Sequence, residues 1–222
     1  MSIEVVGRAS SSNVQKVLWA LDELGLPYAR RPLGGGFGGG ASPEYRALNP
    51  NGLVPTYIED GFALWESDAI VRHLARTRGP GTLLPEDPRA QAVADMWTCW
   101  AAFTLYPALR PLFFGVVRTP RAERRLTGWE AEAAALAAAV GVLDAALADR
   151  PFLAGDAFSF GDIAPAINAR RALKLPVGAP ASAPNVSAWL DRLAERPGFR
   201  RWVDVPMGAC LEEWSEIERR LG

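Results

Sequence analysis

Apolar and polar positions at the start of the chain predict a mixed strand-and-helix unit. Residues 3–7 form a β-branched run that fits a buried strand, and residues 28–33 can form a second one. Between them, apolar residues recur at helical spacing over residues 14–24, and Ser12 with Gln15 matches a capping box at the helix start. The predicted order to this point is strand, helix, strand.

A short helix, a hairpin and a further helix complete this unit. Ser42 followed by Pro43 begins the short helix, since Ser is a common N-cap and Pro suits the first helical position. Residues 56–59 and 62–65 are predicted to pair as a hairpin, because the preferred two-residue turn Asp-Gly separates them. The last helix begins at Glu66-Ser67 and keeps its apolar period for about three turns.

The rest of the chain is helical by pattern. Residues 79–88 are rich in Gly and Pro and act as a linker by composition, and no convincing strand follows them. We therefore predict an α/β domain over residues 1–78, the linker over 79–88 and an all-α domain over 89–222. A capping box formed by Ser159 and Asp162 begins one of the helices. The predicted helical segments are residues 89–115, 121–148, 161–174, 186–196 and 207–220.

Composition and charge exclude several classes of function. Lys and Arg number 24 against 25 Asp and Glu, so no global basic field exists to hold nucleic acid or an anionic membrane. No run of about 18 consecutive apolar residues is present to span a membrane, and residues 1–4 lack the start of a secretory signal. We expect a cytoplasmic protein that binds neither nucleic acid nor membrane, and we interpret the excess of Arg over Lys as genome composition.

Cysteine and histidine are too scarce for several kinds of site. Cys99 and Cys210 are the only cysteines, which is too few for a disulfide scaffold and too widely spaced for a CxxC motif. His73 is the only histidine, so a His-rich metal site is excluded and no metal is expected. We expect His73 to pack or to face a partner subunit, and Cys99 to be a small core residue.

The glycine-rich residues 34–40 offer a nucleotide-binding motif that the context contradicts. Gly34, Gly36 and Gly39 satisfy the GxGxxG spacing. A dinucleotide fold needs a buried strand before this motif and a long helix after it. Here the preceding strand is polar and the following helix is broken at Asn49-Pro50, so we reject nucleotide binding.

Four segments, taken in order, resemble the cytosolic glutathione transferases with a serine-type active site. The resemblance covers essentially the whole chain, and the order and spacing of the segments are more specific than any one of them. It implies a thioredoxin-like N-terminal domain, an all-α C-terminal domain and glutathione as co-substrate. The segments are Ser11-Ser12-Asn13-Val14-Gln15-Lys16-Val17, Asn49-Pro50-Asn51-Gly52-Leu53-Val54-Pro55, Leu64-Trp65-Glu66-Ser67-Asp68-Ala69-Ile70, and Phe152-Leu153-Ala154-Gly155-Asp156 through Ser159 and Asp162.

The resemblance implies that the start of the first long helix holds the glutathione sulfur. A thiol reacts as its thiolate, and hydrogen bonds together with a helix N-terminus lower the thiol pKa. Counting back from Val17, Ser11 falls on the family's activating serine and Asn13 on a second sulfur-contacting position. Ser12 is the alternative catalytic serine, and helix capping alone is a competing explanation for both serines. The absence of Cys at this helix start disfavours the thiol-reductase branch of the family.

Two further pairs are implied to bind the rest of glutathione. Val54-Pro55 resembles the family's cis-proline site, where the backbone pairs with the cysteinyl part of glutathione; a trans proline entering an edge strand is the alternative. Ser67 at a helix start suits the γ-glutamyl carboxylate, and Glu66 suits the γ-glutamyl ammonium. Capping explains Ser67 by itself but not the Glu-Ser pair after a hairpin.

The position before Val54 departs from the family pattern. Many members carry Lys or another polar residue there, whereas this chain has Leu53. The glycine end of glutathione is therefore assigned to the loop around Phe37 and Gly38, or to an Arg elsewhere in the chain.

Aromatic residues are the candidates for binding the second substrate. Four of them recur every three residues, but at about 100° per residue they cannot all share one helix face. Some are expected to line a cleft above Ser11, and others to enter the core or a dimer contact. An apolar cleft favours a small hydrophobic electrophile. The candidates are Trp97, Trp100, Phe103, Tyr106 and Phe113, with Phe114 as an extension.

The predicted function is transfer of glutathione to that electrophile. The alternatives are a glutathione-dependent peroxidase or isomerase, and a binding module that keeps the fold without catalysis. The resemblance also implies a homodimer built across the third and fourth helices. Candidate interface residues are Arg72, Arg76, Asp68 and Asp95, which solvation of a surface explains equally well.

Overall fold

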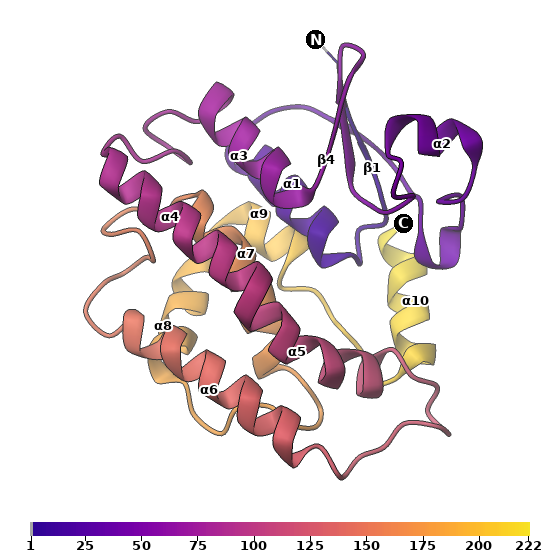
Figure 1. Cartoon of the computed structure of the whole chain (residues 1–222), viewed down its shortest axis with the longest axis vertical. Helices are drawn as coiled ribbons and strands as arrows, with labels where there is room; N and C mark the ends of the chain where they lie inside the picture. Colours follow the sequence, from indigo (N-terminus) through magenta and orange to yellow (C-terminus); the bar gives the residue numbers. More distant parts are fainter. Residues whose placement is uncertain (1) are drawn as a thin grey trace.

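A four-stranded mixed sheet organises the N-terminal domain in the computed structural model, which describes residues 2–222 (Figure 1). The strand order is β2-β1-β3-β4. The central strand β1 (Ile3–Val6) pairs in parallel with β2 (Ala29–Arg31) and antiparallel with β3 (Thr56–Glu59). The predicted hairpin is confirmed, since β3 pairs antiparallel with β4 (Phe62–Trp65).

Both faces of this sheet are covered, because alternate residues of a strand point to opposite faces. Ile3 and Val5 join the main core, which α1 (Ser12–Glu23) and α3 (Ser67–Arg78) complete. Val6 points the other way and packs in a small second cluster with Tyr45 of α2 (Pro43–Leu48). The glycine-rich loop holds one short 3-10 turn, η1 (Gly35–Phe37).

The second domain begins with one long helical stretch. It consists of α4 (Pro88–Trp100), the π-helical turn η2 (Ala101–Leu105), α5 (Tyr106–Leu112) and a second π-helical turn, η3 (Phe113–Val117). Pro107 and Pro111 cannot donate backbone hydrogen bonds, and wider turns flank the α5 segment that contains them. By length and composition alone the stretch Pro88–Val117 could cross a membrane. In the structure it packs on α6 (Glu130–Ala146) and α7 (Phe160–Leu173).

The helix α7 (Phe160–Leu173) is buried along most of its length, and it packs against α1, α4 and α8 (Pro184–Leu193). The predicted capping box at its start is confirmed: Asp162 accepts hydrogen bonds from the backbone N–H groups of Ser159 and Leu153 and from Trp189 Nε1. Burial raises the pKa of Asp162 to about 6, although these hydrogen bonds oppose the shift. The other helices are α6 (Glu130–Ala146), α8 (Pro184–Leu193), α9 (Pro197–Trp202) and α10 (Leu211–Leu221).

Several predicted helix ends are wrong. The segment predicted from residue 121 begins only at Glu130, and the one predicted from 207 begins at Leu211. The segment 186–196 is shorter than expected, because Pro197 starts the separate helix α9. At α1 the N-cap is Ser11, and the predicted capping box of Ser12 and Gln15 is absent from the described structure.

The two domains share one core, and α10 returns to the N-terminal domain. Trp19 of α1 stacks on Phe158 and meets Phe199 edge-on, with ring centroids 5.4 and 5.2 Å apart. Figure 1 shows α10 beside the sheet domain, with the C-terminus near β1 and α2. Arg30 of β2 fixes this end by donating to the backbone oxygen of Gly222 at 2.5 Å.

Candidate active site

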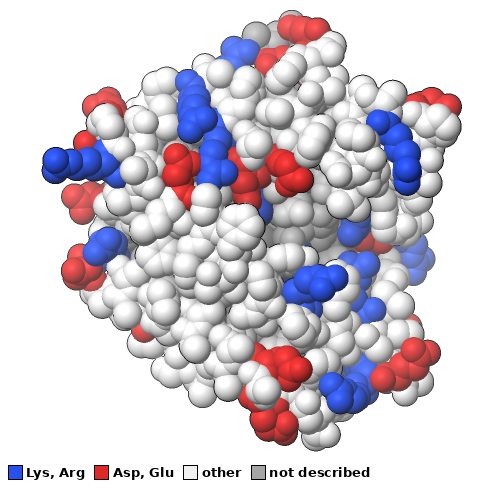
Figure 2. Space-filling view, in the orientation of Figure 1, with Lys and Arg blue, Asp and Glu red and all other residues white. Residues whose placement is uncertain are grey.

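A cleft of about 640 Å³ lies between the two domains, and Figure 2 shows a hollow there with basic side chains at its rim. Its N-terminal side is formed by the start of α1, the glycine loop and the segment that leads to β3. Its other side comes from the α5–η3 region, α7 and α10. The predicted site residues that line it are Ser11, Ser12, Asn13, Gly38, Leu53, Val54, Tyr106 and Phe113.

The strand register explains why three of the predicted segments meet. Val6 of β1 pairs with Thr56 of β3, and Thr56 pairs with Trp65 of β4. The residues just beyond these pairs therefore leave the sheet at the same end. They are the loop into α1, the Val54-Pro55 pair and the Glu66-Ser67 pair.

Ser11 carries a hydroxyl that is not used for helix capping. It is the N-cap of α1 with extended backbone angles, and its side chain makes no capping hydrogen bond within residues 2–222. Its backbone oxygen accepts the first helical bond, from Gln15 N at 2.9 Å. The first N–H groups of α1, beginning at Ser12, have no partner inside the helix by its geometry. The start of α1 thus presents a hydroxyl and backbone donors to the cleft, which suits a negatively charged atom.

The segment before β3 is held through its backbone. The Val54–Pro55 peptide bond is cis, as the resemblance implied. The backbone oxygen of Leu53 accepts hydrogen bonds from Tyr45 Oη at 2.5 Å and from Asn49 Nδ2 at 2.8 Å, whereas its side chain is 68% exposed. The segment therefore has a fixed backbone and offers no charge of its own.

Glu66 and Ser67 lie at the same end of the sheet but do not line the cleft. Glu66 has a φ of 70°, an uncommon conformation for a residue with a side chain. Ser67 is buried at the start of α3, and its hydroxyl lies 3.4 Å from Lys16 Nζ, which also forms a 2.9 Å ion pair with Asp68. Asp68, predicted for a dimer interface, is thus paired within the chain.

The glycine loop divides between the cleft and α10. Gly38 lines the cleft, but Phe37 lies in a separate hollow beside Trp214 and Glu218 of α10. Arg46 of α2 lines the cleft as well, close to Leu53. It is a cation that the sequence motifs did not identify, although an Arg outside the loop was one of the alternatives.

The aromatic candidates separate as the helical rotation required. Tyr106 and Phe113 line the cleft together with Phe114, whereas Trp97, Trp100 and Phe103 do not. Trp97 is buried and meets Trp100 edge-on at 5.1 Å, and Phe103 is 81% exposed on the outside of the helix. A fourth aromatic residue, Trp214 of α10, also lines the cleft, and its ring lies 5.3 Å from that of Phe113.

Three arginines in the wall of the cleft were missed by the sequence analysis. Arg8 precedes α1, Arg118 follows η3 and Arg171 lies on α7. Burial lowers the pKa of Arg171 to about 9 and lowers that of Arg118, and in both cases neighbouring arginines add to the shift. None of these three arginines lies in a sequence motif, and the excess of Arg over Lys was interpreted as genome composition. The sequence therefore did not distinguish them from the other arginines.

Other singled-out residues lie elsewhere. His73 packs between the rings of Tyr57 and Phe62, so the packing alternative is confirmed. The prediction for Cys99 is wrong: its thiol is exposed and lies 3.4 Å from Arg72 Nη2, because the core face of α4 is occupied by residues such as Trp97. Arg72 and Arg76 both contact Asp95 within the chain. Residues 2–222 contain no group of three or more His, Cys, Asp and Glu arranged to hold a metal ion.

Comparison with known proteins gives one consistent match. The glutathione S-transferase N-terminal domain model matches residues 5–82, and the C-terminal domain model matches residues 105–197. The chain is 39% identical to glutathione S-transferase GstB of Escherichia coli strain K12 over 92% of this chain and 99% of that protein. It is 30% identical to glutathione S-transferase 3 of Zea mays over 90% of this chain and 93% of that protein. The crystal structure of a theta class glutathione S-transferase from Xanthomonas axonopodis pv. citri with glutathione bound superposes with a TM-score of 0.87, at 40% identity over 93% of this chain and 99% of that one.

Proposed function

The chain belongs to the glutathione S-transferase family, and on that basis we propose that it holds the glutathione thiolate at Ser11 and conjugates it to an organic electrophile. The observation that carries the proposal is the hydroxyl of Ser11, which lines the cleft without capping the helix it precedes. Residues 1–78 bind glutathione in this proposal, residues 79–88 link the domains, and residues 89–222 supply the wall that faces the electrophile.

The chemistry at Ser11 is stabilisation of negative charge on sulfur. A free thiol has a pKa near 8.5, and a donated hydroxyl together with a helix N-terminus lowers this value. The Ser11 hydroxyl donates to the thiolate, Asn13 supports it, and the thiol proton passes to solvent. The thiolate then forms the carbon–sulfur bond, while the leaving group departs with its electron pair.

The rest of glutathione extends along the end of the sheet. The backbone of Val54 pairs with the cysteinyl part, and the γ-glutamyl group reaches Glu66 and Ser67. The glycine carboxylate lies near Gly38 and Arg46, because Arg46 is a cation that lines the cleft and Leu53 offers only its backbone. Ser12 lines the cleft beside this ligand path, whereas Phe37 lies in the separate hollow next to α10 and has no part in binding glutathione.

The electrophile occupies the side of the cleft formed by Tyr106 and Phe113, next to the sulfur. Trp97, Trp100 and Phe103 have no part in this binding site. We also propose that the protein acts in the cytoplasm as a homodimer, as is typical of the family; sedimentation velocity tests the assembly.

Replacing Ser11 by Ala tests the proposal directly. The S11A variant is expected to bind glutathione nearly as well as the wild type, but to raise the pKa of the bound thiol toward its free value near 8.5. The measurement is ultraviolet absorbance of the thiolate across a pH titration of the complex. Ser12→Ala is the matched control, because Ser12 is the next residue in the chain and lines the same cleft.

Two results would contradict the assignment. An unchanged thiol pKa in S11A removes the catalytic role from Ser11. A raised pKa in S12A with a normal value in S11A transfers that role to Ser12.

A further inference from the structure

Three arginines line the cleft, and Glu218 of α10, which lines the neighbouring hollow, pairs with one of them. Arg8 Nε lies 2.8 Å from Glu218 Oε1 of α10, and both side chains are largely buried. Arg118 and Arg171 line the same cleft. Within residues 2–222, neither of these two arginines has a carboxylate oxygen within 4.0 Å, so the wall carries more positive than negative charge.

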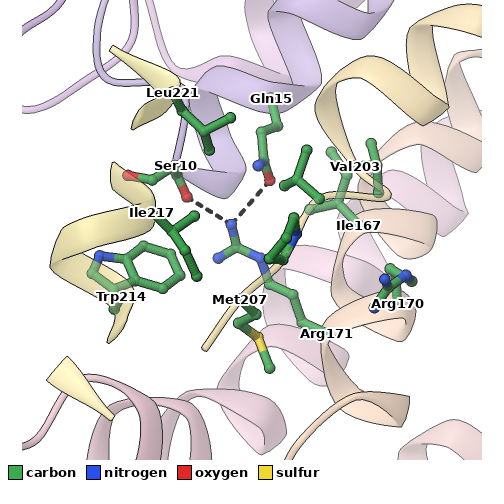
Figure 3. Close-up of a pocket in the computed structure, with 12 residues that line it drawn as sticks. Ser10, Gln15, Ile167, Arg170, Arg171, Val203, Met207, Trp214, Ile217 and Leu221 are labelled. Atoms are coloured by element: carbon green, nitrogen blue, oxygen red, sulfur yellow. Dashed lines mark hydrogen bonds between the residues drawn. The ribbon is translucent and has the colours of Figure 1, made fainter. Parts of the chain in front are cut away.

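Arg171 is held by neutral groups only. Figure 3 shows its guanidinium between Ser10, Gln15 and the α10 side chains, with Nη2 donating to the Ser10 backbone oxygen at 2.8 Å and to Gln15 Oε1 at 2.9 Å. A cavity of about 20 Å³ behind it has room for about one water molecule. These contacts orient the guanidinium and leave its charge uncompensated.

Arg118 is even less satisfied. Its Nε is buried without a hydrogen-bond partner in the described part of the chain, and its guanidinium lies over Trp214 at 4.6 Å and Phe114 at 5.7 Å from the ring centroids. A buried unpaired donor of a charged group costs free energy, and such groups concentrate at functional sites. The guanidinium fork is suited to bind a carboxylate through two parallel hydrogen bonds.

This wall lies next to the sulfur position. Arg171 contacts the backbone of Ser10, the residue before Ser11, and Arg8 lies at the start of the same loop. The carboxylates of glutathione are assigned to other groups, namely Arg46 in the cleft and Ser67 at the end of the sheet. In this assignment no carboxylate of glutathione pairs with Arg118 or Arg171, so both guanidinium groups stay available to another anionic ligand.

We propose that Arg118 and Arg171 form an anion-binding subsite for the second substrate, which is an aromatic electrophile that carries a carboxylate. The rings of Phe113, Phe114 and Trp214 bind its aromatic body, and Arg118 binds the carboxylate. The inference rests on the proposed function and changes the expected substrate from a purely hydrophobic molecule to an organic anion.

The reaction balances for an aryl chloride of this type. The glutathione thiolate forms a bond to the ring carbon that bears chlorine, and chloride leaves with the electron pair of the broken bond. The products are the aryl thioether, chloride and the proton that the thiol released to solvent.

A pair of electrophiles that differ only in charge tests the subsite. Conjugation of glutathione to chlorodinitrobenzoate and to the neutral chlorodinitrobenzamide is measured as kcat/KM, and each value is divided by the uncatalysed rate constant. The wild type is expected to favour the benzoate by about 10-fold or more, the range of a hydrogen bond to a charged group. Arg118→Met is expected to lower this preference about 10-fold. A loss of folded protein leaves the ratio unchanged, because both substrates are measured on one preparation.

Arg110→Met is the matched control. Arg110 lies over the same Phe114 ring, at 5.2 Å from its centroid, but it is exposed and does not line the cleft. Its variant is expected to keep the wild-type preference for the benzoate. Arg118→Lys, which keeps the cation without the planar fork, is expected to give an intermediate preference.

Calorimetric titration of the chlorine-free pair, dinitrobenzoate and dinitrobenzamide, separates the subsite from catalysis. Tighter binding of the benzoate that disappears in R118M and persists in R110M supports the subsite even where no conjugate forms, and a lack of conjugate would then contradict only the proposed function. Equal binding of the two compounds by the wild type, or a preference that survives in R118M, overturns the subsite.

Discussion

Glu218 is expected to stabilise the contact between α10 and the active-site loops. Its carboxylate accepts hydrogen bonds from Ser10 Oγ at 2.6 Å and from the backbone N–H of Gly36 at 2.9 Å, and it lies 2.8 Å from Arg8 Nε. The side chains of Glu218 and Arg8 are 5% and 17% exposed. One residue therefore connects the C-terminal helix to the loop before α1 and to the glycine loop.

The effect of Glu218→Gln follows from this geometry. Breaking a buried ion pair by removing one partner costs about 3–5 kcal/mol, because the other charge stays buried. Since Gln keeps one oxygen that can accept from Ser10 or Gly36, we expect the free energy of unfolding to fall by about 3 kcal/mol. For a chain of this length that corresponds to a decrease in Tm of roughly 6–12 °C.

Urea unfolding followed by tryptophan fluorescence measures the change, and hydrogen exchange of the α10 amides shows whether this helix opens first. Glu216→Gln is the matched control on the same helix. Glu216 pairs with Arg220 at the exposed i, i+4 spacing, where a salt bridge contributes about 0.5 kcal/mol or less. Equal destabilisation by the two variants would refute the reasoning.

The pH dependence gives a second check on Glu218. Burial alone would raise the pKa of this carboxyl, but the hydrogen bonds from Ser10 and Gly36 and the charges of Arg8 and Arg118 hold it below its usual value. A group whose pKa is lowered by folding stabilises the protein above its unfolded pKa, and that contribution is lost as the pH falls through the folded value. The difference between wild type and E218Q should therefore shrink in acid, and a constant difference would contradict the assigned charge.

Two further pairs of substitutions test the packing. Gly115→Ala is expected to cost about 1–3 kcal/mol, because its Cβ would clash with the ring of Trp129. Gly141→Ala in the open middle of α6 is expected to stabilise by about 0.5–1 kcal/mol. Thermal unfolding measures both, and equal signs would contradict this account. Asp162→Asn is expected to cost about 2–4 kcal/mol, against little change for the exposed Asp156→Asn. Because folding raises the pKa of Asp162 from 3.8 to about 6, its contribution is largest below pH 3.8 and declines as the pH rises through 6, so the loss in D162N should be greater near pH 4 than near pH 7.

The fold and the sheet end of the site were predictable because they rest on local patterns. The Asp-Gly turn fixes the β3–β4 pairing, and that register brings Val54-Pro55 next to Glu66-Ser67. The start of α1 was predictable because β1 is followed within a few residues by serines, which are common helix N-caps. Each of these features lies within a few residues of its own signal in the sequence.

The other side of the site depends on contacts that no local pattern records. Gly36 and Glu218 are 182 residues apart in sequence, and Ser10 and Arg171 are 161 apart. Helical periodicity identifies α7 and α10 as helices. It does not show that α7 contacts the loop before α1 or that α10 contacts the glycine loop. For the same reason, the spacing of the aromatic residues predicted that they diverge without predicting that Tyr106 and Phe113 would face the cleft.

Arginine count alone does not distinguish a binding residue from a solvated one, whereas burial does. Arg110 and Arg118 both lie over the ring of Phe114, yet Arg110 is exposed and Arg118 has a buried, unpaired Nε. A second carboxylate beside Glu218 would stabilise the folded chain by neutralising this wall, but it would also occupy the position that an anionic substrate needs. A wall that keeps its charge unbalanced loses stability in the absence of ligand and binds an anion more strongly when one arrives, which is the exchange of stability for function expected at an active site.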